Sequence, residues 1–120
     1  MLQDKNEKLK SEYTQKVVEK ERQIDDLNNE KRQIQEIVES LEIELTRNFR
    51  QLQVLNEELI KDGNSSARWE QEELQGKKKH FCQFFKEQKQ ELAEMYTKSV
   101  EELNEERAEI QKERNKLTWD

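Results

Sequence analysis

The chain has 120 residues, of which 31% are hydrophobic and 42% are charged, and its formal net charge is −6. An ordinary globular domain has roughly 45–50% apolar residues, so this composition excludes a core that is covered on all sides. The chain has no proline and two glycines, and this scarcity of turn residues argues against a β-sheet protein. Half of the residues are Ala, Glu, Lys, Leu or Arg, which is typical of long helices and coiled coils. We therefore expect an all-α fold.

The first predicted element is a coiled-coil helix over residues 2–61. Apolar residues that recur at alternating steps of three and four lie on one side of a helix and form a coiled-coil seam. We expect this seam to contain Val17, Ile24, Leu27, Ile34, Val38, Leu41, Leu45, Leu52, Leu55 and Leu59. Lys20, Lys31 and Asn48 take the remaining seam positions, where polar groups either fix register and oligomeric state or extend to solvent.

A break is predicted over residues 62–66, which read Asp-Gly-Asn-Ser-Ser. Gly63 suits the left-handed conformation that follows a helix C-terminus, because glycine has no Cβ to clash there. We expect Ser65 or Ser66 to be the N-cap of the next helix. Since no proline is present, the alternative is a helix that runs through this break at a cost of about 1 kcal/mol for the glycine.

The second predicted element is a coiled-coil helix over residues 67–119. Its seam is less regular than the first and contains more aromatic residues. The expected seam positions are Leu74, Lys78, Phe81, Phe85, Gln88, Leu92, Tyr96, Val100, Leu103, Arg107, Ile110, Arg114 and Leu117. Gly76 is the one weak point that we expect inside this helix.

The sequence leaves two ways to cover these seams, because a lone helix buries nothing and needs a partner helix. A hairpin closed at the break would bring opposite charges together. It places Glu39, Glu42 and Glu44 near Lys86 and Lys89. The same hairpin places Lys16, Lys20 and Arg22 near Glu106, Glu109 and Glu113. In an elongated parallel dimer, mostly uncharged residues flank the first seam and offer few ion pairs. The distribution of charges therefore slightly favours the hairpin over the dimer.

Catalytic residues are scarce, so we expect no enzyme activity, no metal site, no cofactor and no small-molecule substrate. The single histidine, His80, lies two residues from the single cysteine, Cys82, which places their side chains about 200° apart on a helix. They cannot act together as base and nucleophile within one helix. Four carboxylates do share one helical face, and we interpret them as a solvated acidic face. These are Glu102, Glu105, Glu106 and Glu109.

The stretch from Trp69 to Phe85 is the most distinctive part of the sequence and the candidate partner-binding site. It contains three consecutive lysines followed by three phenylalanines: Lys77, Lys78, Lys79, Phe81, Phe84 and Phe85. Aromatic residues on an exposed helical face are typical anchors of helix-in-groove recognition. The simpler interpretation is that Phe81 and Phe85 fill the seam. This interpretation does not account for Phe84 and Trp69, which lie beside the seam.

The heptads, the absence of proline and the Glu/Lys/Gln-rich composition resemble rod segments of cytoskeletal, centrosomal, ciliary and vesicle-tethering coiled-coil proteins. The resemblance covers nearly the whole chain but singles out no family and transfers no functional residue. It implies a structural or scaffold role in oligomerisation and spacing, with the Trp69–Phe85 binding module as the alternative. We expect protein partners, either a second copy or another coiled coil, and no nucleic acid, because the net charge is acidic.

The location that we expect is the cytoplasm, where an association with the cytoskeleton would suit the resemblance. The single cysteine favours a reducing compartment, and no apolar stretch approaches the roughly 18 residues that span a bilayer. The sequence reaches Asp120 without a helix stop signal. We therefore expect it to be a fragment or short form of a longer coiled-coil protein.

Overall fold

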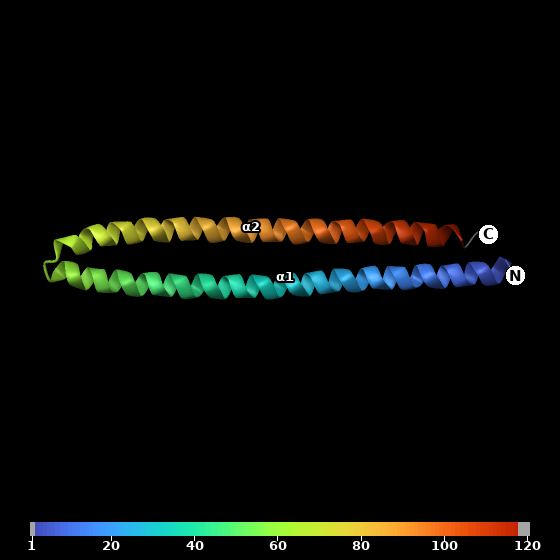
Figure 1. Cartoon of the computed structure of the whole chain (residues 1–120), viewed down its shortest axis with the longest axis horizontal. Coiled ribbons are helices and arrows are strands. Elements are labelled where there is room, and N and C mark those ends of the chain that lie inside the picture. The colour runs from blue at the N-terminus through green and yellow to red at the C-terminus, as the bar shows by residue number, and fades with distance from the viewer. Residues whose placement is uncertain (1, 118–120) are drawn as a thin grey trace. The chain divides into compact units, whose positions relative to one another are not determined.

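The computed structural model describes residues 2–117, with side chains described from residue 4 onward, and contains two long α-helices. Helix α1 runs over Leu2–Lys61 and helix α2 over Ser65–Lys116 (Figure 1). Among the described residues there is no strand, so the expected all-α class with a break near 62–66 is confirmed. Helix α2 begins two residues before the expected boundary at 67, and the expected end at 119 lies outside the described residues.

The turn between the helices is closed by backbone hydrogen bonds around Gly63. The Asn64 N–H donates to the Leu59 carbonyl at 3.0 Å, and the Gly63 N–H donates to the Ile60 carbonyl at 3.1 Å. Gly63 has φ of 90°, a left-handed conformation that costs most residues about 1–2 kcal/mol. This pair of bonds is the Schellman motif that commonly ends a helix, and it confirms the position expected for Gly63.

The N-cap of α2 is Asn64, which corrects the prediction of Ser65 or Ser66. Asn64 Oδ1 accepts a hydrogen bond from the Ser66 backbone N–H at 3.1 Å and one from Ser66 Oγ at 2.7 Å. Asparagine is as good an N-cap as serine, and its use here moves the helix start toward the turn. The turn is therefore short, because one residue follows Gly63 before the helix begins.

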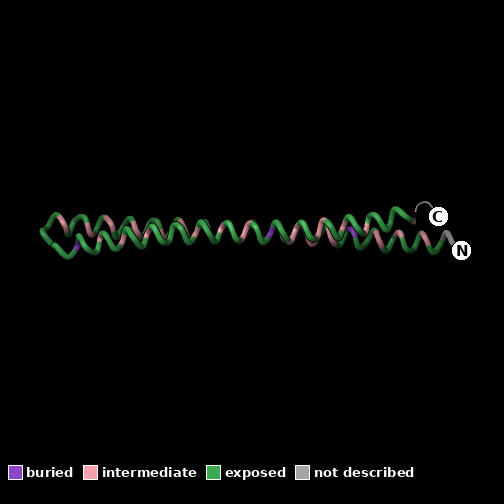
Figure 2. Tube along the Cα trace, turned by 90° about the horizontal axis from the view of Figure 1, so that it is seen from above, coloured by how far each residue is buried: buried purple, intermediate pink, exposed green. Residues whose placement is uncertain are grey.

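The structure divides into two compact units, and each contains one stretch of α1 packed on one stretch of α2. Unit 1 comprises Met1–Arg32 and Ala93–Asp120, and unit 2 comprises Gln33–Leu92. Unit 2 includes the turn, so its two stretches are the antiparallel arms of a helical hairpin. Burial is sparse in both units, and most of the trace in Figure 2 is exposed.

Unit 1 buries apolar residues from both of its stretches. Val17 and Ile24 of α1 and Tyr96 of α2 are all buried. Charged residues flank them, with Lys20 Nζ at 2.6 Å from Glu106 Oε2 and Arg107 at 3.8 Å from Glu21. The hairpin arrangement places Lys20 near a group of glutamates on α2, with Glu109 opposite it. The structure pairs Lys20 with Glu106, three residues before Glu109 on the same helix.

Unit 2 pairs its arms through aromatic and charged residues. The rings of Phe49 and Phe81 lie 5.6 Å apart between centroids. Lys89 forms an ion pair with Glu42, which the hairpin arrangement also predicts. Near the turn, the small side chain of Ala67 is completely buried. The hairpin interior of unit 2 thus combines aromatic, charged and small side chains.

Candidate interaction site

The face of α1 that packs in unit 2 is not the one that the heptads predict. Its half-buried positions include Ile34, Val38, Glu42, Leu45, Phe49, Gln53, Asn56 and Ile60. Residues eleven apart recur in this set, as in Val38, Phe49 and Ile60. An eleven-residue repeat is close to the 3.6 residues per turn of a straight helix, whereas a seven-residue repeat drifts about 20° per heptad around it.

Four leucines of the predicted seam are left exposed by this drift. Leu41, Leu52, Leu55 and Leu59 have between 42% and 56% of their surface exposed. These four leucines therefore lie outside the face of α1 that packs on α2, and their role in an oligomerisation seam stays a prediction. The physical reason is that α1 follows its own helical period, so the face toward α2 moves off the leucines to Glu42, Phe49 and Gln53.

The other predicted seam residues lie toward the partner stretch of their own unit. Ile24 and Tyr96 are buried in unit 1. The half-buried seam residues are Leu27, Ile34, Val38, Leu45, Leu92, Leu103, Ile110 and Leu117. In α2 three of the expected seam positions are exposed, Phe81, Gln88 and Arg114. Beside Gln88, it is Lys89 that is half-buried. The ion pair between Lys89 and Glu42 accounts for that shift.

In unit 2 the two helices lie side by side as a layer with two broad faces. Two shallow grooves run between the helices on one of these faces, and the residues that line them show which residues belong to it. The first groove is lined by Glu39, Glu42, Ile43, Thr46 and Lys89, and the second by Phe49, Gln53, Leu74, Gln75 and Lys78. Thr46 of α1 and Gln75 of α2 therefore point to the same face. We call it the basic face, for the arginines and lysines described below.

The exposed leucines lie on the opposite face. Each residue advances about 100° around a helix, which puts the four leucines about 120–180° from Thr46 around α1. By the same measure Phe84 lies about 180° from Gln75 around α2, and it is 48% exposed. We call this surface, made of Leu41, Leu52, Leu55, Leu59 and Phe84, the leucine face.

The candidate partner-binding residues do not form one patch. Trp69 is 62% exposed, but it precedes Phe84 by fifteen residues, which is about 22 Å along the helix. Phe85 and Lys78 are half-buried toward α1. Phe81 is 39% exposed and its ring contacts that of Phe49 at a tilt of 52°. Lys77 and Lys79 are exposed on opposite faces of the layer. Of this group, Phe84 belongs to the leucine face, and Lys77 lies at its border.

Two exposed apolar residues on the basic face were missed by the heptad analysis. Ile43 is 61% exposed and Val54 is 47% exposed. They are eleven residues apart, as are Leu41 and Leu52 on the leucine face. The signal that could have found them is this shared eleven-residue spacing, which a search for heptads overlooks.

The buried tyrosine of unit 1, Tyr96, has a raised pKa. Burial raises the pKa of the Tyr96 hydroxyl above its ordinary value, and the nearby Glu30 carboxylate raises it further by charge and by a hydrogen bond. Both causes favour the neutral phenol. Tyr96 therefore acts as a packing residue that is protonated at neutral pH.

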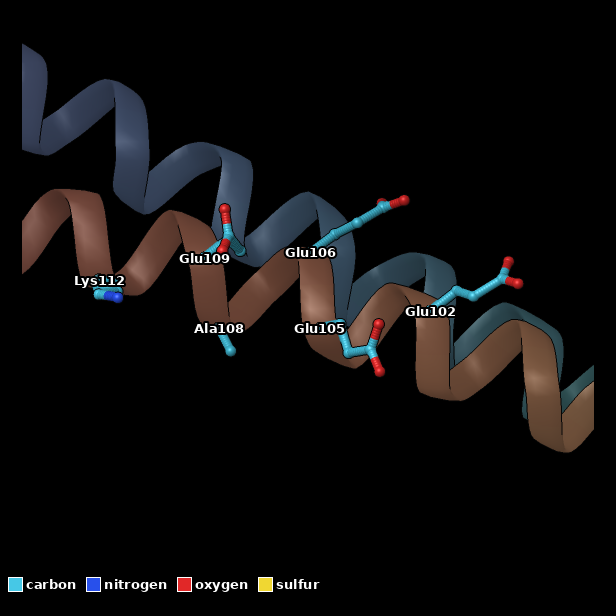
Figure 3. Close-up of a pocket in the computed structure, with 6 residues that line it drawn as sticks. All are labelled: Glu102, Glu105, Glu106, Ala108, Glu109 and Lys112. Carbon is cyan, nitrogen blue, oxygen red and sulfur yellow. The ribbon is translucent and has the colours of Figure 1, made fainter.

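The acidic face of unit 1 offers no converging ligands. Figure 3 shows Glu102, Glu105, Glu106 and Glu109 with their carboxylates spread along α2. Glu106 is paired with Lys20. Over the part of the chain that the structure describes, no three His, Cys, Asp or Glu residues are grouped as metal ligands. Cys82 is exposed and unpaired with another cysteine.

Compared with protein-family models, with curated proteins and with solved structures, the chain gives no significant match. Within residues 2–117, neither helix has a stretch long and apolar enough to cross a membrane. The geometry of the two units is therefore the main basis for assigning a function.

Proposed function

We propose that this chain is a non-enzymatic structural segment that assembles with other helices through the leucine face of unit 2. The observation that carries the proposal is the exposure of Leu41, Leu52, Leu55 and Leu59, four leucines at coiled-coil spacing, on one face of a two-helix layer. Apolar side chains that are scattered singly on a surface need no explanation, but a cluster of them is typical of a protein interface. Leu52, Leu55 and Leu59 form such a cluster, and Leu41 lies on the same face eleven residues before Leu52.

The energetics favour a helical partner. Burying a leucine side chain fully stabilises a folded or associated state by about 1.5–3 kcal/mol. Each of the four leucines is about half exposed, so covering all four would favour association substantially. A helix added to this face would convert the two-helix layer of unit 2 into a three- or four-helix bundle, which packs by the same side-chain interdigitation. The partner in the proposal is a second copy of the chain or another coiled coil.

The cellular role in the proposal is that of a scaffold or spacer in a larger assembly. Its support is the resemblance in composition and heptads to cytoskeletal, centrosomal and ciliary rod segments. A cytoplasmic location, with association to the cytoskeleton, belongs to the same proposal.

Light scattering on the eluate of a size-exclusion column, over a concentration series, tests the proposal. The mass of the wild-type chain should rise above 14.6 kDa as concentration increases. Replacing Leu52 and Leu55 with glutamine should keep the mass at the single-chain value, because polar side chains remove the apolar row.

The matched control replaces Val18 and Met95 of unit 1, which are as exposed as the leucines, with glutamine and should associate like the wild type. A wild-type mass that stays at one chain at every concentration would contradict the proposal for self-assembly.

A second candidate function is a binding module that presents aromatic side chains to a different protein. The observation that favours it is the exposure of Trp69 and Phe84, which leaves two large rings outside the hairpin interior. Replacing both with alanine should remove a partner while the far-UV helicity stays unchanged. A simultaneous loss of helicity would mean that these rings support the fold instead.

A further inference from the structure

The two faces of unit 2 differ in charge. Four exposed carboxylates and one lysine border the leucine face, which gives it a net charge of −3: Glu44, Glu70, Glu73, Glu91 and Lys77. A row of leucines with such a border is complementary to an apolar surface that carries basic residues. Packing two leucine faces on each other would instead bring like charges together.

The basic face of unit 2 has the complementary character. It exposes the apolar side chains of Ile43 and Val54. Six basic and five acidic exposed residues surround them, for a net charge of +1: Arg47, Arg50, Lys61, Arg68, Lys79, Lys86, Glu36, Glu39, Glu57, Glu58 and Glu72. The same molecule therefore carries both halves of a matched pair of surfaces.

We propose that the occupant of the leucine face is a second copy of this chain, which docks its basic face there. This inference rests on the proposed function, and it names the partner and the arrangement. The contact is heterologous, because the leucine face of one copy meets the basic face of the next. It stacks the two-helix layers of unit 2 with α1 on α1 and α2 on α2.

The sequence spacing fixes the register of this contact. If the second copy is displaced by two residues, about 3 Å along the helix, Leu41 meets Ile43 of the next copy and Leu52 meets Val54. Because α2 runs antiparallel to α1, the same displacement brings each α2 residue opposite the residue two positions earlier in the next copy. Glu70 then meets Arg68 of the next copy, and Gln88 meets Lys86. One displacement thus matches two apolar pairs on α1 and two polar pairs on α2, while it brings Leu55 and Leu59 opposite Glu57 and Lys61 of the next copy.

A heterologous contact of this kind does not close on two copies. Each added copy leaves one free leucine face and one free basic face at the ends, so the assembly grows as an open stack. The mass of the wild-type chain should therefore keep rising with concentration and not level off at two chains. Raising the salt concentration should reduce the mass, since ion pairs across the contact are screened.

Complementation between two variants tests the proposal. The leucine-face variant carries Leu41→Gln and Leu52→Gln, and the basic-face variant carries Ile43→Gln and Val54→Gln. All four positions are exposed, so the far-UV helicity of both variants should match that of the wild type. Each variant alone should show the mass of one chain. An equimolar mixture should form a complex of two chains and no larger species, because one intact face of each kind remains.

A second pair of variants tests the charges by the same logic. Glu70→Arg in one preparation and Arg68→Glu in another should each weaken association at least tenfold when studied alone, because two like charges then meet across the contact. The mixture should recover association, because the reversed charge of one variant meets the oppositely reversed charge of the other. Failure of the mixture to recover would overturn the assigned register.

The outcomes separate the two proposals. If the wild type associates and the leucine-face variant does not, but the basic-face variant associates like the wild type, the proposed function stands and the heterologous contact is overturned. The heterologous contact is also overturned if the mixture of the leucine-face and basic-face variants stays at the mass of one chain. If the wild type itself never exceeds one chain, both self-assembly proposals fail together.

Discussion

Unit 1 and unit 2 are built from the same two helices but use their apolar residues differently. Among the described residues, unit 1 leaves three large apolar side chains exposed, Leu9, Val18 and Met95. Unit 2 leaves ten exposed, including four leucines of the predicted seam. Unit 2 contains more large apolar residues than the described part of unit 1, but it also leaves a larger share of them exposed. The difference arises because the packed face coincides with the apolar residues in unit 1 and departs from them in unit 2.

The comparison teaches that a hydrophobic seam and a helix-pairing face are separate properties of a sequence. In unit 1, Val17 and Ile24 lie on both, and the pairing satisfies them. In unit 2, the pairing places Glu42 and Lys89 inside and leaves Leu55 outside. An apolar row that its own hairpin does not cover is then available for a partner.

Truncation of one apolar residue in each unit should break this comparison most clearly. Ile24→Ala in unit 1 should lower the free energy of unfolding by about 2–3 kcal/mol, because the side chain is buried and leaves a cavity. Leu52→Ala in unit 2 should change it by about 0.5 kcal/mol or less, as is usual for exposed positions. Urea unfolding followed by circular dichroism, at a concentration where the chain is monomeric, measures both. Equal losses would contradict the assigned difference between the units.

Replacing either glycine of unit 2 with alanine should change the stability by an intermediate amount. Gly63→Ala should destabilise the hairpin by about 1–2 kcal/mol, because the left-handed backbone there disfavours a Cβ. Gly76→Ala is the matched control: a Cβ there meets nothing within 4 Å, and the helix should gain about 1 kcal/mol. Thermal melting measures the opposite shifts. A loss of stability in both variants would mean that Gly76 is needed for close packing.

The ionisation of Tyr96 should have the smallest effect on stability of the three. It tests whether this side chain is buried in unit 1. Its pKa is higher in the folded chain than the ordinary value of about 10, because of burial and the Glu30 carboxylate. Its contribution to stability is therefore fully present below the unfolded pKa and is lost as pH rises toward the folded pKa. In a Tyr13→Phe background, absorbance near 295 nm should report a single tyrosine that ionises above the ordinary value. An ordinary midpoint would show that Tyr96 is solvated.

Much of the fold follows from sequence because it depends on local chemistry. The absence of proline and the charged helix formers predict two helices, and Gly63 marks the turn by its backbone freedom. The pairing of Lys89 with Glu42 also follows, since a closed hairpin brings residues on opposite arms together at fixed register. The same register brings Lys20 to the cluster of glutamates that contains Glu106, although it sets Glu109 opposite. The N-cap was misplaced because Asn64 and its two following serines are all capable of capping.

The candidate site could not be predicted in the same way, because it depends on which side of α1 meets α2. A heptad search assumes 3.5 residues per turn, whereas the pairing face in unit 2 follows an eleven-residue spacing. Leu41 and Leu59 fit the first pattern and Phe49 fits the second, so the sequence carries both. The position of Phe84 beside the leucines follows only when the grooves show which faces of the two helices are shared.

Cysteine accessibility is the most direct test of the central claim that unit 2 leaves its leucines uncovered and uses them for assembly. In a Cys82→Ser background, Leu55→Cys probes the leucine face and Leu45→Cys probes the face toward α2. In dilute solution a maleimide reagent should modify the cysteine at position 55 rapidly and the one at position 45 slowly. At high concentration position 55 should become protected as well. Slow modification of both positions at every concentration would contradict the claim, because it would place the leucines against α2.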